Sequence, residues 1–163
     1  MTTKVRPRFS FAHWLAFLLP AALLAGAYGS QYIGGLYPCE MCWWQRYPHF
    51  AAVGIAMVAF AVGNPFYRKT LIALAALAIA TSGVIAGYHA GVEYTWWDGL
   101  TKCTSSVTGT GKDLLDSIMN APLIRCDVAP WSLFGISLAG YNFLLSLGGA
   151  IAILFMTWKT PKI

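Results

Sequence analysis

Four long stretches of this 163-residue chain contain no Lys, Arg, Asp or Glu. These uncharged stretches cover residues 9–39, 47–67, 70–92 and 128–158. Each is long enough to supply the roughly 20 residues that an α-helix needs to cross the hydrocarbon core of a bilayer. Because every backbone polar group in lipid needs an internal partner, stretches of this length favour a bundle of membrane-spanning helices.

The pattern predicts an all-α membrane protein, a four-transmembrane-helix bundle in one domain over residues 1–163. Composition agrees with this prediction, because 58% of the residues are hydrophobic and only 10% are charged. Soluble domains carry about 25% charged residues. The predicted spans are residues 11–28, 40–62, 70–89 and 131–158, and a long loop covers residues 90–130.

Basic residues predict which side of the membrane each loop faces. A set of Lys and Arg residues flanks one group of span ends, and the positive-inside rule places that group in the cytoplasm. The set consists of Lys4, Arg6, Arg8, Arg68, Lys69, Lys159 and Lys162. Both termini are therefore expected inside, and the 90–130 loop and all four cysteines outside. The net charge of +5 does not indicate nucleic-acid binding, because these residues form no continuous basic stripe.

The first uncharged stretch also has features of a secretory signal peptide. Basic residues precede the apolar run, and Ala25-Gly26-Ala27 is similar to a small-residue cleavage site. We favour a retained span, because the run is longer than the apolar core of about 7–15 residues that is usual in a signal peptide. Cleavage would leave the orientation of the other spans unchanged.

The long outer loop is the segment with the most room outside the membrane. Residues 105–111 are rich in Ser, Thr and Gly, which predicts a flexible stretch. After it, Leu114, Leu115, Ile118 and Met119 recur at helical spacing. This spacing predicts a short amphipathic helix on the membrane surface, with ordinary packing of the loop as the alternative.

A C-x-x-C motif stands where the second span begins. Pro38 suits the first turn of a helix, and Cys39 and Cys42 follow it. The unpaired amides and the dipole at a helix N-terminus favour a thiolate, so this position is typical of a redox-active pair. A static disulfide and half of a zinc site are the alternatives. Zinc is disfavoured because the chain has no second C-x-x-C, so we expect no metal.

The other two cysteines, Cys103 and Cys126, lie in the outer loop on either side of the flexible stretch. Each follows a basic residue, Lys102 or Arg125, and a nearby positive charge lowers a thiol pKa. A disulfide between them in a mobile loop would suit exchange with a soluble partner. A structural disulfide that holds the loop together is the alternative.

Arg46 and His89 are candidate binding residues at a similar depth in the membrane. Arg46 lies one helical turn beyond Cys42 on the same face, where a buried guanidinium needs an anionic or polar partner. His89, near the outer end of the third span, is placed to bind a ligand oxygen or to deliver a proton. The alternatives are an Arg that reaches the interface and a His that bonds a neighbouring helix.

The run Pro38-Cys39-Glu40-Met41-Cys42-Trp43-Trp44-Gln45-Arg46-Tyr47-Pro48, followed by Cys103 and Cys126 in a four-span chain, resembles the disulfide bond formation protein B (DsbB) family. The resemblance covers nearly the whole chain. It implies that Cys39 and Cys42 are linked to a quinone, ubiquinone or menaquinone, with Cys42 contacting it and Arg46 assisting. It also implies that Cys103 and Cys126 oxidise a periplasmic, thioredoxin-like partner of the DsbA type, with Cys103 forming the mixed disulfide. His89 matches a family histidine.

The expected function is therefore that of a protein-dithiol:quinone oxidoreductase in a bacterial inner membrane, with the cysteines on the periplasmic side. Electrons would pass from the partner through Cys103 and Cys126 to Cys39 and Cys42 and then to the quinone. Three other functions remain open: a membrane scaffold with structural cysteines, a metal-binding module, and a reductase of the vitamin K epoxide reductase type. The motif Cys-Glu-Met-Cys-Trp-Trp-Gln-Arg and the loop length differ from the best-known family members.

Overall fold

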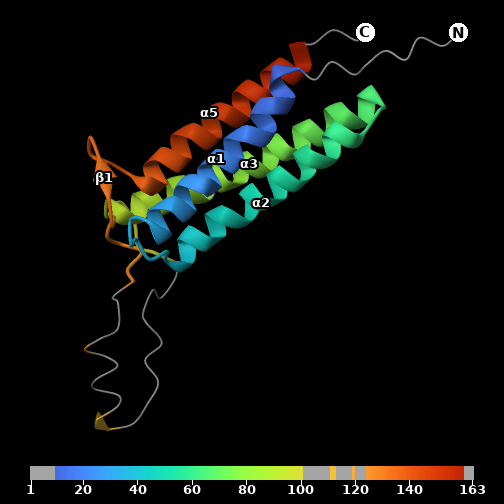
Figure 1. The fold of residues 1–163 in the computed structure, drawn as a ribbon. Helices are drawn as coiled ribbons and strands as arrows, with labels where there is room; N and C mark the ends of the chain where they lie inside the picture. The colour runs from blue at the N-terminus through green and yellow to red at the C-terminus, as the bar shows by residue number, and fades with distance from the viewer. Residues whose placement is uncertain (1–9, 101–110, 113–118, 120–123, 160–163) are drawn as a thin grey trace, which may run out of the picture.

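The structure is a computed structural model that describes residues 10–100, 111–112, 119 and 124–159. Four long helices lie side by side, and a small antiparallel hairpin precedes the last of them (Figure 1). The helices are α1 (Phe11–Tyr32), α2 (Glu40–Ala61), α3 (Pro65–Glu93) and α5 (Leu138–Lys159), and the strands are β1 (Ser132–Leu133) and β2 (Ile136–Ser137). The all-helical class is confirmed for the described residues, with the hairpin as the exception.

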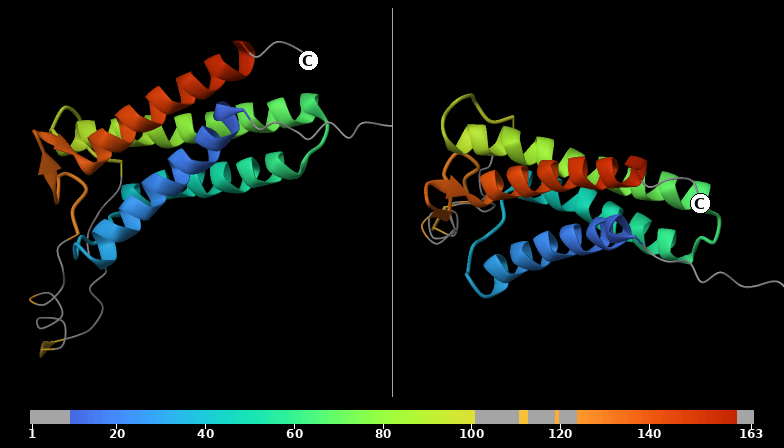
Figure 2. Two further views of the ribbon diagram at one scale, coloured as in Figure 1. Left: turned by 45° about the horizontal axis from the view of Figure 1, so that its top comes forward. Right: turned by 90° about the horizontal axis from the view of Figure 1, so that it is seen from above.

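The bundle has two distinct ends. One end holds the start of α1, the turn between α2 and α3, and the end of α5 (Figures 1 and 2). The basic residues Arg68, Lys69 and Lys159 belong to this end. The other end holds the loop between α1 and α2, the end of α3, and the hairpin. This division agrees with the two-sided distribution of charge in the sequence.

Small residues form the centre of the bundle. Ala52, Ala56, Ala75 and Ala76 are fully buried in one apolar cluster, where α3 packs against both α2 and α5. A Cβ atom added to Gly87 would lie 2.7 Å from the ring of Phe143, so this glycine allows α3 and α5 to approach closely. Small residues at helix contacts are typical of membrane bundles, where close packing stabilises association.

Three of the four helices are long and apolar enough to cross a membrane: α1, α3 and α5. This protein is therefore a membrane protein with three candidate spans. The first three turns of α2 carry Gln45, Arg46 and His49, which lowers the mean hydropathy of this helix. These polar side chains are buried inside the bundle. A fourth span through α2 stays a prediction.

The start of the last helix differs from the prediction. A span from residue 131 was expected, but the hairpin occupies the first residues and α5 begins at Leu138. Phe134 and Gly135 adopt positive φ angles of 50° and 76°, a left-handed turn that a helix cannot continue through. Apolar composition placed this segment in a span, but the hairpin is largely exposed, and composition does not reveal a turn.

Three other boundaries also differ. Helix α1 continues to Tyr32 and α3 to Glu93, beyond the ends expected at residues 28 and 89, and α3 begins at Pro65, before the start expected at residue 70. Uncharged composition locates the apolar part of a span, whereas a helix continues into the interface for as long as its hydrogen bonds are satisfied. The amphipathic helix predicted in the outer loop falls, apart from Met119, outside the described residues, as does Cys103.

Candidate functional site

The C-x-x-C motif lies at the N-terminus of α2. Cys39 is the N-cap residue, and its Sγ accepts a hydrogen bond from the backbone N–H of Cys42 at 3.3 Å. Both cysteines are free thiols, with their Sγ atoms 3.0 Å apart. The predicted placement of this pair at a helix N-terminus is confirmed, and Cys39 is the residue that caps the helix.

The surroundings of the Cys39 thiol favour its protonated form. The hydrogen bond to Cys42 and, next, burial raise the pKa of the Cys39 thiol, although the backbone amides of Cys42 and Met41 act in the opposite direction. At this residue the effect of the helix N-terminus is weaker than that of the neighbouring sulfur.

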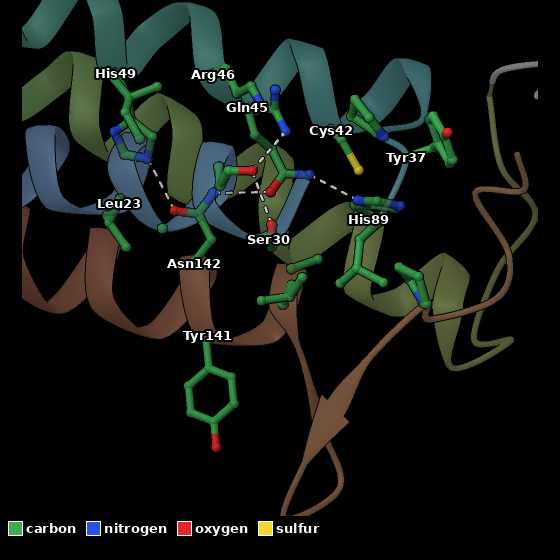
Figure 3. A pocket seen from close by; sticks show the side chains of 18 of the residues that line it. Leu23, Ser30, Tyr37, Cys42, Gln45, Arg46, His49, His89, Tyr141 and Asn142 are labelled. Atoms are coloured by element: carbon green, nitrogen blue, oxygen red, sulfur yellow. Dashed lines mark hydrogen bonds between the residues drawn. The ribbon is translucent and has the colours of Figure 1, made fainter. Parts of the chain in front are cut away.

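A cavity with mostly apolar walls opens beside this pair, bounded by α1, α2, α3 and α5. Cys42 lines it, whereas Cys39 does not. Figure 3 shows the Cys42 sulfur directed to the side where Gln45 and His89 lie. The polar side chains on the wall include Arg46, Gln45, His49, His89, Glu93 and Asn142. An apolar pocket with a few convergent polar groups is typical of a binding site for an organic ligand.

Arg46 is buried, with 5% of its surface exposed. Its Nη1 donates to Gln31 Oε1 at 2.7 Å and its Nη2 to the carbonyl of Ala27 at 3.2 Å, both on α1. The guanidinium carbon also lies 4.8 Å from the ring centres of Tyr28 and Trp43. Its polar partner is thus found on α1, and no carboxylate pairs with it among the described residues.

His89 is held in one tautomer by Gln45. The Gln45 Nε2 atom lies 3.1 Å from the carbonyl oxygen of Met41 and 2.8 Å from His89 Nδ1. A carbonyl oxygen only accepts, so this Gln45 atom is the amide nitrogen and donates to both. His89 Nδ1 is therefore an acceptor, and the ring proton sits on Nε2. That Nε2 lies 3.6 Å from Cys39 Sγ and donates to it.

The hydrogen-bond chain continues into the bundle. Asn142 Nδ2 donates to Gln45 Oε1 at 2.9 Å, and His49 Nε2 donates to Asn142 Oδ1 at 3.0 Å (Figure 3). Ser82 supports the chain, because its hydroxyl donates to the Gln45 carbonyl and lies 2.9 Å from His49 Nε2. The donors run from His49 through Asn142 and Gln45 to His89, so residues of α2 and α5 set the orientation of a side chain on α3.

Cys126 approaches the same place from the outer loop. It is buried and disulfide-bonded, and its partner lies outside the described residues. Its Sγ, the Cys39 Sγ and a ring nitrogen of His89 all lie within 4.8 Å of one another. These three residue types also bind metals, but a disulfide sulfur is not a thiolate, so Cys126 offers no metal ligand in this state.

The basic residue before Cys126 is engaged elsewhere. Arg125 donates from Nε and Nη2 to both carboxylate oxygens of Asp127, at 2.9 and 2.6 Å. These bonds lower the pKa of the Asp127 carboxyl and raise that of Arg125. The ion pair offsets the positive charge that was expected to act on the Cys126 thiol.

Sequence reasoning did not identify Glu93 as a site residue. Its side chain is 2% exposed, and its Oε1 lies 3.8 Å from His89 Nε2. Its Oε2 accepts a hydrogen bond from the hydroxyl of Ser137 on β2. The one available signal was its spacing, because Glu93 follows His89 by four residues and so shares a helix face with it.

This chain is similar to proteins of one family. The family model described as "Disulfide bond formation protein DsbB" matches residues 9–156. Proteins named disulfide bond formation protein B from Polaromonas sp. and Methylococcus capsulatus are each 30% identical to this chain. The first match covers 91% of this chain and 90% of the relative, and the second 91% and 93%.

A third relative of the same name, from Verminephrobacter eiseniae, is also 30% identical, over 80% of this chain and 75% of its own length. No solved structure matches the chain. The relatives therefore identify the family of this chain. The geometry of the site rests on this structure alone.

Proposed function

The chain belongs to the DsbB family of disulfide bond formation proteins, and we propose that it is a thiol:quinone oxidoreductase that reoxidises a periplasmic partner of the DsbA type. One observation carries this proposal. The disulfide-bonded Cys126 lies beside Cys39, and the other thiol of that pair, Cys42, lines an apolar cavity with Arg46. Two cysteine pairs and an acceptor site would thus form one continuous path.

The proposed orientation follows the charges. The end of the bundle with Arg68, Lys69 and Lys159 faces the cytoplasm, and the end with the cysteines faces the periplasm. The location proposed is a bacterial inner membrane, with four spans and both termini inside. The periplasm is an oxidising compartment in which disulfides persist.

The first step is exchange with the partner. A partner thiolate attacks Cys103 in the proposed Cys103–Cys126 disulfide, forms a mixed disulfide and releases Cys126 as a thiolate. A second partner thiolate then resolves the mixed disulfide, which leaves the partner oxidised and Cys103 reduced. The partner's two electrons now reside on the cysteines of the outer loop.

The second step is exchange between the pairs. When Cys39 and Cys42 form a disulfide, the Cys126 thiolate attacks the Cys39 sulfur and Cys42 leaves as a thiolate. The distance of at most 4.8 Å between the Sγ atoms of Cys126 and Cys39 supports this choice of sulfur. The Nε2–H of His89 stabilises charge on Cys39, because it donates to that sulfur. Cys103 then displaces Cys39, so the loop disulfide reforms and Cys39 and Cys42 are both reduced.

The residues of the cavity fit a quinone. A quinone, when bound, accepts two electrons and two protons, and its ring needs apolar walls with donors for its oxygens. Cys42 supplies the electron-donating sulfur, and Arg46 is the cation placed to stabilise negative charge on an oxygen beside it. Ubiquinone and menaquinone both have the required chemistry.

The test is quinone reduction by the purified protein in detergent, supplied with a reduced DsbA-like partner. We expect reduction that depends on the partner and is lost in Cys42→Ser, with Asp98→Asn as a matched surface control. Failure of the wild type to reduce either ubiquinone or menaquinone analogues would overturn the proposal. Bound zinc or copper near one equivalent would instead favour a metal-binding module. Cysteines that do not react with dithiols would favour a scaffold.

A further inference from the structure

The proposed relay moves protons as well as electrons. Oxidation of the Cys39 and Cys42 thiols to a disulfide breaks two S–H bonds and releases two electrons and two protons. Reduction of the quinone to hydroquinone takes up both electrons and forms two O–H bonds. Because the cavity walls are mostly apolar, a titratable group on the wall is suited to carry protons between sulfur and oxygen. The inference below rests on the proposed function.

His89 is close to the thiols but is poorly placed for this task. Its Nδ1 faces the amide nitrogen of Gln45, which donates to it, so a proton on Nδ1 would meet another donor. Its Nε2 already carries the ring proton. Taking up a proton would break the bond to Gln45, and giving one up would leave an imidazolate. His89 is therefore held as a hydrogen-bond donor to the Cys39 sulfur, 3.6 Å away.

The second histidine on the cavity wall is held in a similar way. His49 donates from Nε2 to Asn142 at 3.0 Å and is buried within the chain of hydrogen bonds. It lies seven residues beyond Cys42, about two helical turns farther into the bundle. From this position His49 helps to orient Gln45 through Asn142. It lies too far from the thiols to take a proton from them directly.

Glu93 has the geometry that the histidines lack. It lines the cavity together with Cys42 and Arg46, and its side chain is almost completely buried. Ser137 donates to Oε2, and the Ser137 hydroxyl in turn accepts the N–H of Gly140 at 3.1 Å, which directs its proton to Glu93. One oxygen is thus fixed as an acceptor, and Oε1 makes no hydrogen bond among the described residues.

Glu93 also has no strong cation to hold it ionised. No Lys or Arg pairs with it in the described part of the chain; the titratable groups that face it are His89, whose Nε2 lies 3.8 Å from Oε1, and Cys42. A buried carboxylate without a cation is costly, whereas the neutral acid can donate a proton to an oxygen that gains negative charge. It is also the only carboxyl group among the described residues that line the cavity.

We propose that Glu93 is the proton carrier of the site, which gives its proton to an oxygen of the quinone as Cys42 supplies electrons. One S–H proton of the Cys39–Cys42 pair then returns to Oε1 as the disulfide forms, so Glu93 ends the cycle as it began. The second thiol proton completes the hydroquinone. No oxidant other than the quinone is needed.

Glu93→Gln is the test variant, because it keeps the shape and the acceptor oxygen for Ser137 and removes the exchangeable carboxyl proton. Asp98→Asn, an exposed carboxyl on the same end of the bundle, is the matched control. We expect quinone reduction to slow by roughly 100-fold or more in Glu93→Gln, the usual effect of removing a general acid. Exchange between the partner and the cysteines, followed by mass spectrometry of trapped thiols, should be unchanged.

Two further measurements separate a proton carrier from a structural residue. Small carboxylic acids added to Glu93→Gln should restore part of the rate, and the rate in this variant should vary less with pH than the rate of the wild type. In infrared difference spectra recorded as dithiol reduces the protein, a carboxyl band should change in the wild type and be absent in Glu93→Gln. The control variant should keep this band.

The outcomes distinguish this inference from the proposed function. Unchanged turnover and pH profile in Glu93→Gln, with an active wild type, would overturn the role of Glu93 and leave the relay intact. Slower turnover with impaired cysteine exchange and no rescue by acids would also overturn it, because Glu93 would then act on structure. A wild type inactive toward every quinone would instead overturn the relay.

Discussion

Replacing Arg46 with Met tests how this protein stabilises charge in its cavity. Met replaces the aliphatic stem of Arg with a similar apolar chain, but it lacks the guanidinium that donates to Gln31 and to the carbonyl of Ala27. Leaving these two acceptors without a donor costs about 1–3 kcal/mol each. Part of this loss is offset, because the variant no longer buries a charge. We therefore expect the folded bundle to persist with a modestly lower Tm.

The effect on quinone use should be larger than the effect on stability. A hydrogen bond from a charged group contributes about 1.5–3 kcal/mol, which corresponds to roughly 10- to 150-fold in kcat/KM. The assay is steady-state quinone reduction with a reduced partner, with exchange between the cysteine pairs measured separately in the same preparation. Arg46→Lys is the matched variant, because it keeps the charge but loses the planar contacts with Tyr28 and Trp43.

The expected ranking in kcat/KM for quinone is wild type, then Arg46→Lys, then Arg46→Met, with exchange between the cysteine pairs preserved in all three. Equal kcat and KM in a folded Arg46→Met protein would refute the assigned role. A variant that lost cysteine exchange and quinone use together would show that Arg46 mainly holds α1 against α2.

Three other predictions concern the relay and the bundle. Gln45→Leu should lower the free energy of unfolding by about 2–5 kcal/mol in detergent, because it leaves several buried polar groups unpaired; an unchanged Tm would contradict the hydrogen-bond chain. Gly87→Val should destabilise the bundle by about 1–3 kcal/mol, because the new side chain meets Phe143. Gly54→Ala is the control: its new Cβ meets nothing within 4 Å, so this variant should be neutral or slightly stabilised in the same thermal scan. Cys103→Ser should abolish partner oxidation, measured by partner thiol content, and normal turnover would exclude Cys103 as the entry point.

The helices and the redox motif could be predicted from local sequence because their signals are local. Absence of charge over about 20 residues indicates a membrane-spanning helix, and the predicted start of the second helix is close, although Pro38 precedes the N-cap residue Cys39 and is not in the first turn as expected. The left-handed turn at Phe134 and Gly135 could not be read in this way, because an apolar run is compatible with either a helix or a hairpin. The first turns of α2 are polar, so hydropathy does not indicate a helix there. The C-x-x-C motif was the signal for the start of this helix.

The partners of the site residues depend on tertiary contacts and were beyond sequence reasoning. The need of Arg46 for a polar partner was predictable, but its location on α1, at Gln31, was not. The importance of Gln45 is visible only when Met41, His89 and Asn142 are all in place. Glu93 looked like one more acidic residue outside the membrane, until its burial against Ser137 became visible.

The most direct test of the relay is to identify which cysteines join when electrons pass between the two pairs. In Cys42→Ser, Cys39 stays a thiol that can attack the Cys126 sulfur of the intact loop disulfide and displace Cys103 as a thiolate, so peptide mapping by mass spectrometry of the oxidised variant, without reduced partner, identifies the new bond. The proposed path predicts a Cys39–Cys126 disulfide, in keeping with their sulfurs lying within 4.8 Å. A bond from Cys39 to Cys103, or no bond between the two pairs, would contradict it.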